Sequence, residues 1–500
     1  MNNDSSQKNL GKSISVGASW MVALRWTIKS LGLISSIILA RLLMPEDFGL
    51  IALAMSVYAL IRLIREFGFG AALIQNQNAT RVHYNSAWTL QVILSSVAAL
   101  LLVSVAPFAS TIYDDDRLTP LLIILSFSFF VTGFYNIGTI DFRKNMTFDK
   151  VFTLNIIPKI FSFITTISLA FYLRNYWALL IGQLTNQLLS VVMSYTMQSY
   201  RPRFSLAAWR ELMGFSSWLM LNNVITYMNR HGRNIVVAMI GGPPMVGLIS
   251  VSTDFATIVS MELIAPINTA AYPGYSRVNN NSEKLRKVFL EVVSVISLLA
   301  IPGSIAIAAL VPLFVPVLLG EKWLEAVTVI PAMAYASIFM AFSSAFDMAL
   351  MAVARQRVTT ALVTIRLIIF FPLMYCLLGI DGAKGVADAL LVSNLLVFPI
   401  YLVAVRRYLG ASISSFLSTT LRPTLASIIM FLAVAHYVGF LGSQVLGVKG
   451  IIGLASAVGL GAIVLILSSY LIWWLFGKPD GVESRIVNIV QNKVRSIAWW

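Results

Sequence analysis

Residues 40–51 have the sequence ARLLMPEDFGLI, and residues 238–249 have the sequence AMIGGPPMVGLI. The two stretches match without a gap, because Pro45 corresponds to Pro243 and the same Gly-Leu-Ile run ends both of them. Proline interrupts a helix and glycine accommodates a turn, so each stretch is typical of a connection between two helices. The match predicts that the chain contains two copies of one structural unit.

Long apolar runs continue on both sides of these stretches. Of the 500 residues, 58% are apolar and 11% are charged, and the mean hydropathy is +0.82, which exceeds what a water-soluble core needs. The runs are continuous and long enough to cross about 30 Å of hydrocarbon as helices, whereas barrel strands would alternate over short segments. We therefore expect an all-α membrane protein with about fourteen transmembrane helices. The predicted spans are 14–40, 47–74, 84–111, 118–139, 150–173, 176–199, 209–238, 246–273, 288–314, 324–352, 358–379, 384–405, 419–440 and 449–476.

The loop cations predict the orientation of the chain. Paired cations recur in alternate loops: Arg143 with Lys144, Arg201 with Arg203, Arg286 with Lys287, Arg355 with Arg357, and Arg406 with Arg407. Because Lys and Arg remain on the cytoplasmic side, these loops and both termini are predicted to be cytoplasmic. The formal net charge of +15 then reflects membrane orientation, and we expect no nucleic-acid partner.

The repeat predicts the domain organisation. Six predicted helices separate the matching stretches, so both copies enter the membrane in the same direction and form parallel lobes, with substrate bound between them near the midplane. We predict an N-lobe at 1–205 (helices 1–6), a C-lobe at 206–410 (helices 7–12) and two further helices at 411–476. Apolar residues and cations recur at helical spacing in 477–500, which predicts an amphipathic helix on the cytoplasmic face.

Further stretches carry a family resemblance. They are EFGFGAALIQ (66–75), FRKNMTFDK (142–150) and WALLIGQL (177–184), with SSWLMLNNV (216–224), AAYPGYSRV (270–278) and GAKGVADALLVSNLL (382–396) in the second half. Together with ARLLMPEDFGLIAL (40–53), they resemble the polysaccharide transport family of the multidrug, oligosaccharidyl-lipid and polysaccharide flippase superfamily, in its colanic-acid and O-antigen exporter type. The resemblance spans the whole chain.

The resemblance implies a function. Such a protein translocates an undecaprenyl-diphosphate-linked oligosaccharide repeat unit across the bacterial inner membrane by alternating access, for exopolysaccharide or O-antigen biosynthesis. The implied partners are that lipid-linked diphosphate, membrane lipids, H⁺ or Na⁺, and polysaccharide polymerase and assembly proteins. Two alternatives stay open: a multidrug antiporter of the related branch, and an integral-membrane polysaccharide polymerase or ligase. The histidines are scattered and no nucleotide motif is complete, so we expect a protein that is not an enzyme, without cofactor or metal.

Cations inside the predicted spans are the candidate substrate site. A charge at the bilayer centre costs about 2.5–3.5 kcal/mol on insertion scales, so such residues usually face a protein interior or a hydrated cavity. Arg25 and Lys29 are four residues apart and share one helix face, where an anion such as a diphosphate would relieve their repulsion. The predicted cationic cavity consists of Arg25, Lys29, Arg62, Lys159, Arg230 and Arg366.

Acidic residues inside the spans are fewer. Glu66, Asp254, Glu262 and Asp347 are candidate ion-coupling residues, although Arg62 and Glu66 are also spaced to form a salt bridge within one helix. Lys159 and Arg366 fall on equivalent helices of the two repeats, which favours one cavity with a cation from each lobe. The stretch YDDDRL (113–118) is interpreted as a solvated turn on the side opposite the cytoplasm.

Overall fold

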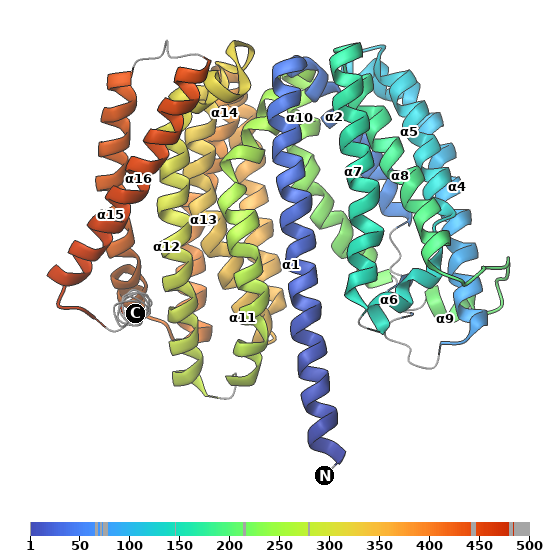
Figure 1. Ribbon diagram of the computed structural model, residues 1–500, viewed down its shortest axis with the longest axis horizontal. Helices are drawn as coiled ribbons and strands as arrows, with labels where there is room; N and C mark the ends of the chain where they lie inside the picture. The colour runs from blue at the N-terminus through green and yellow to red at the C-terminus, as the bar shows by residue number, and fades with distance from the viewer. Residues whose placement is uncertain are drawn as a thin grey trace, which may run out of the picture. The chain divides into compact units, whose positions relative to one another are not determined.

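The computed structural model describes residues 2–65, 69, 70, 73, 79–145, 147–213, 217–278, 281–441, 447–479 and 484 (Figure 1). Every secondary-structure element in these residues is a helix, which confirms the predicted all-α class. Contacts divide the chain into two compact units, Met1–Gly247 and Leu248–Trp500. The boundary falls within one helix, α10 (Ser217–Ala256). The predicted lobe limits at 205 and 410 stay predictions.

The first unit is built from paired long helices. In this unit α4 packs on α5, α7 packs on α8, and α1 packs along α7. The connection between α5 and α6 bends by 67°. The helices that precede α10 are α1 (Asn2–Leu42), α2 (Pro45–Arg62), η1 (Leu63–Arg65), α4 (Arg81–Tyr113), α5 (Leu118–Gly133), η2 (Ile137–Thr139), α6 (Ile140–Lys144), α7 (Phe148–Leu173), α8 (Trp177–Met197) and α9 (Trp209–Met213).

The second unit has an aromatic core. Phe342 and Phe346 on α13 contact Phe398 on α14 and Phe416 on α15, with ring centroids 5.3–6.1 Å apart. These rings form part of a larger buried apolar cluster. The helices are η3 (Ser260–Ile264), α11 (Ala265–Val278), α12 (Ser282–Phe314), η4 (Val315–Leu319), η5 (Glu321–Trp323), α13 (Ala326–Ala352), α14 (Gln356–Leu409), α15 (Ile413–Leu441) and α16 (Val448–Leu475).

Ten of the described helices are long and apolar enough to cross a membrane, and eleven if the bent pair of α5 and α6 forms one span. The chain is therefore a multi-pass membrane protein, as the composition predicted. Two long helices contain a break: α10 at Gly242, with a φ of 65°, and α14 at Gly382, with a φ of 57°. A straight α14 of 54 residues would extend about 80 Å, far beyond one bilayer, and glycine permits the required turn. The count of fourteen and the orientation of the termini stay predictions.

The amphipathic helix predicted at 477–500 lies largely outside the described residues. Of this segment the structure describes 477–479 and 484.

Candidate functional site

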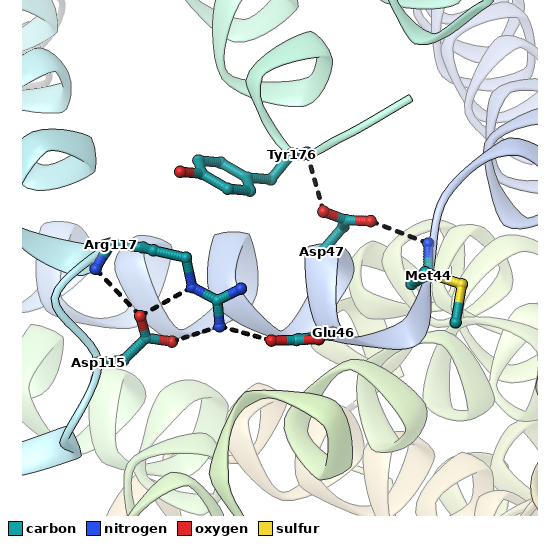
Figure 2. A network of polar contacts seen from close by, with 6 residues as sticks. All are labelled: Met44, Glu46, Asp47, Asp115, Arg117 and Tyr176. Atoms are coloured by element: carbon teal, nitrogen blue, oxygen red, sulfur yellow. Dashed lines mark hydrogen bonds and ion pairs between the residues drawn. The ribbon is translucent and has the colours of Figure 1, made fainter. Parts of the chain in front are cut away.

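The start of α2 explains why MPEDFG (44–49) has these residues. Pro45 is the first residue of α2, where its fixed φ suits the helix and no intrahelical N–H is lost. Asp47 Oδ2 accepts a hydrogen bond from the backbone N–H of Met44 at 2.9 Å, and Asp47 Oδ1 accepts one from Tyr176 at 3.0 Å (Figure 2). One carboxylate thus caps α2 and ties it to the turn before α8.

Glu46 joins α2 to the turn between α4 and α5. Arg117 Nη2 lies 2.6 Å from Glu46 Oε1 and 2.8 Å from Asp115 Oδ2, and Arg117 Nε donates to Asp115 Oδ1 at 2.9 Å (Figure 2). The Asp115 side chain is only 8% exposed, and its hydrogen bonds from Arg117 lower its pKa. The interpretation of YDDDRL as a solvated turn was therefore wrong for Asp115, because the ion pair compensates the desolvation of its carboxylate.

Gly49 and Gly247 allow two helices to cross with their backbones in contact. A Cβ atom placed on Gly49 would lie 1.5 Å from the carbonyl oxygen of Pro243. A Cβ atom placed on Gly247 would lie 1.9 Å from the carbonyl oxygen of Pro45. The contacts are equivalent, since Pro45 matches Pro243 and Gly49 matches Gly247 in the repeat. The matching stretches therefore touch each other reciprocally, as the two sides of a two-fold contact do.

The predicted cations of the first unit lie on α1, α2, α7 and α10. Arg25 is exposed on α1, and Lys29, one turn further, is half-buried. Lys159 is half-buried on α7, directly after the buried Pro158. Arg62 is half-buried in the last turn of α2. Arg230 belongs to α10, but its side chain lies outside the described residues.

In the second unit, the structure brings two predicted residues together with a tyrosine. Tyr401 Oη on α14 donates a hydrogen bond to Asp347 Oδ2 on α13 at 3.4 Å. Arg366, also on α14, lies close enough to interact electrostatically with both of them. Asp347 Oδ1 is buried and accepts no hydrogen bond from the described residues. An acid predicted for ion coupling and a cation predicted for the cavity thus share one site.

The other candidate acids are dispersed. Asp254 is exposed on α10, and Glu262 is half-buried in η3. Glu66, and with it the predicted salt bridge to Arg62, lies outside the described residues. Across the part of the chain that the structure describes, no group of three or more His, Cys, Asp or Glu side chains is arranged to hold a metal ion.

Sequence reasoning missed the residues that join the start of α2 to its neighbours. Glu46, Asp47 and Gly49 lie inside the motif that carried both the repeat and the resemblance, but none was predicted to have a role. The signal for Gly49 was present, because it aligns with Gly247 in the repeat. No local pattern connects Arg117 with Glu46, which lies 71 residues earlier in the chain.

The architecture defines a class of protein: a multi-pass, all-helical membrane protein whose two repeat-related stretches cross at glycines. Residues 38–328, more than half of the chain, match the family model described as "Polysaccharide biosynthesis protein". The chain belongs to this family, which confirms the predicted resemblance to polysaccharide transport proteins.

Curated relatives are similar over most of their length. The chain is 25% identical to the lipopolysaccharide biosynthesis protein WzxC of Escherichia coli (strain K12), over 80% of this chain and 82% of that protein. It is 21% identical to the teichuronic acid biosynthesis protein TuaB of Bacillus subtilis (strain 168), over 66% and 69%. It is 23% identical to the succinoglycan biosynthesis transport protein ExoT of Rhizobium meliloti (strain 1021), over 62% and 64%.

Solved structures share the fold at low sequence identity. The lipid II flippase MurJ in an inward closed conformation has a TM-score of 0.73 at 14% identity, over 91% of this chain and 99% of that chain. An inward-facing multidrug resistance transporter of the MATE family has a TM-score of 0.58 at 15% identity, over 78% and 98%. Both likenesses concern the fold alone.

Proposed function

We propose that this protein is a flippase that moves an anionic oligosaccharide repeat unit, linked to undecaprenyl diphosphate, across the bacterial inner membrane by alternating access. The product would enter exopolysaccharide or O-antigen biosynthesis. Membership of a polysaccharide biosynthesis family supports the substrate class. The names of WzxC and ExoT, a lipopolysaccharide biosynthesis protein and a succinoglycan transport protein, support the same class.

The position of Lys159 is the observation that carries the proposal. It lies 11 residues after Phe148, the first residue of a 26-residue apolar span, and therefore about 17 Å along the helix, near the middle of the span. At this depth a cation costs about 2.5–3.5 kcal/mol unless an anion or water compensates it. The diphosphate of a lipid-linked sugar supplies several anionic oxygens, and it would compensate this charge during transport.

Arg25 and Lys29 act at an earlier stage of the proposed cycle. They lie 2 and 6 residues into the span that begins at Ala23, near the predicted cytoplasmic end. Like charges one helical turn apart repel, and an anion bound to both relieves that repulsion. We assign them to capture of the diphosphate from the cytoplasmic leaflet, and Lys159 to its passage. No step of this cycle makes or breaks a covalent bond, so it requires no catalytic residue.

Asp347 is the proposed coupling residue. Its Oδ1 accepts no hydrogen bond from the described residues, while Tyr401 and Arg366 act on the same carboxyl group. A proton or a sodium ion bound here would neutralise the negative charge of Asp347 and so weaken its attraction to Arg366. The two ions differ in their signature, because a proton site responds to pH whereas a sodium site responds to the sodium concentration.

The test uses charge changes in a strain that lacks the chromosomal gene. Lys159→Gln, and separately the double variant Arg25→Glu with Lys29→Glu, are expected to abolish surface polysaccharide and to leave lipid-linked repeat units in the inner leaflet. Lys159→Arg, which keeps the charge, is the matched control and is expected to retain export. Normal export by both charge variants at normal protein level would refute the proposal. Repeat units stranded in the outer leaflet would instead indicate a polymerase or ligase.

A further inference from the structure

The first unit contains a polar cavity that the proposed transport cycle does not use. Its volume is about 590 Å³, and it lies where α4 begins, α6 runs and α8 ends. It is lined by two arginines, two tyrosines, a glutamine, a carboxylate, a serine and an alanine. The residues used below are Arg81, Tyr84, Asp141, Gln198, Tyr200 and Arg201.

Hydrogen bonds hold the walls of this cavity in place. Arg201 Nη1 donates to the carbonyl oxygens of Gln198 at 2.6 Å and of Tyr200 at 3.1 Å. The hydroxyl of Tyr200 donates to Asn85 Oδ1 at 2.5 Å. Gln198 Nε2 donates to the carbonyl oxygen of Gly138 at 2.7 Å. The segment after α8 is therefore fixed against α4 and η2 before any ligand binds.

The two arginines use their hydrogen bonds on neutral groups. Arg81 Nη2 donates to the carbonyl oxygen of Arg201 at 3.5 Å, and the Arg81 guanidinium lies 5.8 Å from the ring centre of Tyr200. Among the residues that the structure describes, Arg201 donates only to carbonyl oxygens, and its guanidinium lies 5.7 Å from the ring centre of Tyr195. Within the described residues neither guanidinium forms an ion pair with a carboxylate. Both retain N–H groups for an anion.

The carboxylate in the cavity accepts a hydrogen bond from a neutral donor. Tyr84 Oη donates to Asp141 Oδ1 at 2.6 Å, and the rings of Tyr84 and Tyr200 lie 5.7 Å apart. A carboxylate beside aromatic rings is a favourable site for an ammonium group, through charge and through cation–π attraction. The cavity thus offers both an anion site and a cation site, with a lining charge of +1 from two arginines and one aspartate.

The cavity lies at the depth of lipid headgroups. Helix α4 begins at Arg81 and is a 33-residue apolar span, so Arg81 and the cavity that it lines lie at one end of a membrane-spanning helix, at headgroup level. The paired cations Arg201 and Arg203 predict that this level is in the cytoplasmic leaflet.

We infer that this cavity binds the headgroup of a zwitterionic phospholipid that carries a phosphate and a primary ammonium group. Arg81 and Arg201 engage the phosphate oxygens, and Asp141 accepts the ammonium beside the two tyrosine rings. This site is separate from the proposed transport of the repeat unit, and its function is to hold the cytoplasmic end of the first unit in the membrane. Methylation of the ammonium removes its N–H donors to Asp141, so the site favours an ethanolamine headgroup over a choline headgroup.

The test measures which lipid remains on the purified full-length protein. The protein is equilibrated in mixed micelles with equal amounts of phosphatidylethanolamine, phosphatidylglycerol and phosphatidylcholine, and bound lipid is identified by native mass spectrometry. Wild type is expected to retain phosphatidylethanolamine in preference to both other lipids. The double variant Arg81→Gln with Arg201→Gln is expected to retain about tenfold less of this lipid, because a charge-assisted contact is lost.

Two variants separate the two halves of the site. Asp141→Asn is expected to keep lipid binding but to lose the preference for phosphatidylethanolamine over phosphatidylglycerol. Arg203→Gln, which removes a neighbouring cation that does not line the cavity, is the matched control and is expected to bind as wild type does. The helical content of each variant, measured by circular dichroism, shows whether it is folded. If the double variant misfolds, the Asp141→Asn result still decides the assignment.

Several results would overturn the inference. The inference is wrong if wild type retains the three lipids equally, or if Asp141→Asn keeps the wild-type preference. It is also wrong if Arg203→Gln loses as much lipid as the double variant does. Glycerophosphoethanolamine, which has the headgroup without acyl chains, is added as a competitor. Displacement of the lipid by this soluble compound at equal concentration would assign the cavity to a soluble phosphate ligand instead of a membrane lipid.

Discussion

Replacing Gly49 by alanine tests the crossing of α2 and α10 directly. The added Cβ atom would lie 1.5 Å from the Pro243 carbonyl oxygen, whereas real Cβ atoms essentially never approach closer than 3.0 Å, so the backbones have to separate by about 1.5 Å. The same reasoning for Gly247 gives about 1.1 Å, from 3.0 minus 1.9. The obstructing atoms are backbone oxygens, which cannot rotate away. Overpacking of a tight contact costs about 1–3 kcal/mol, and we expect the upper end of this range for Gly49→Ala.

The double variant sharpens the prediction. Once the helices separate to admit the first Cβ atom, the second finds most of the space it needs. The double variant Gly49→Ala with Gly247→Ala should therefore lose about as much stability as Gly49→Ala alone, because contacting residues are not additive. The assay is reversible unfolding of the purified protein in mixed micelles, together with surface polysaccharide in the deletion strain.

Glycines elsewhere in the chain supply the control. A Cβ atom added to Gly459, in the middle of α16, would meet no atom within 4 Å. Gly459→Ala should leave stability unchanged or raise it by up to about 1 kcal/mol, because alanine favours a helix more than glycine does. If Gly49→Ala unfolds like Gly459→Ala, or if the two crossing substitutions are fully additive, the backbone contact is not as described.

Three further predictions address other parts of the molecule. Arg117 lowers the pKa of Asp115, so the Asp115 carboxylate stabilises the fold above about pH 4, and this contribution is lost on acidification below it. Arg117→Gln should flatten this part of the pH dependence of unfolding. An unchanged profile would contradict the role of the ion pair. Phe346→Ala should lower the free energy of unfolding by about 3–5 kcal/mol, because this ring is fully buried among other aromatic rings. Phe440→Ala, at an 83% exposed position, is the control. Similar unfolding of the two variants would contradict the role of Phe346 in the core. Asp347→Asn keeps the size of the side chain but removes its charge, so flipping in proteoliposomes should lose its dependence on a proton or sodium gradient, and a retained dependence at normal protein level would exclude Asp347 as the coupling residue.

Much of the fold could be predicted from the sequence. Apolar length is a property of consecutive residues, and it predicted an all-α multi-pass membrane protein, while the resemblance of the quoted stretches implied a polysaccharide transport family. The structure and the family match confirm these conclusions. The fourteen-helix count, the orientation of the termini and the lobe limits stay predictions. Two of the long helices turn at glycines with non-helical backbone angles, so one long helix can contain more than one predicted span.

Less of the candidate site could be predicted. In-span charges were easy to find, since each stands out against apolar neighbours, but their surroundings depend on how each helix is rotated about its axis. The sequence placed Asp347 and Arg366 in different groups, and the packing of α13 on α14 brings them together with Tyr401. Whether the six predicted cations line one cavity stays a prediction.

The stretches at 40–51 and 238–249 show most clearly which properties the sequence determines and which depend on the tertiary structure. The sequence by itself determined that they are equivalent, because identity at a constant offset is a one-dimensional property. Only the tertiary structure decided that Gly49 and Gly247 meet, and that Arg117 reaches Glu46. Contacts between distant residues depend on the angle and separation at which helices cross, and these result from the packing of the whole unit rather than from any local pattern.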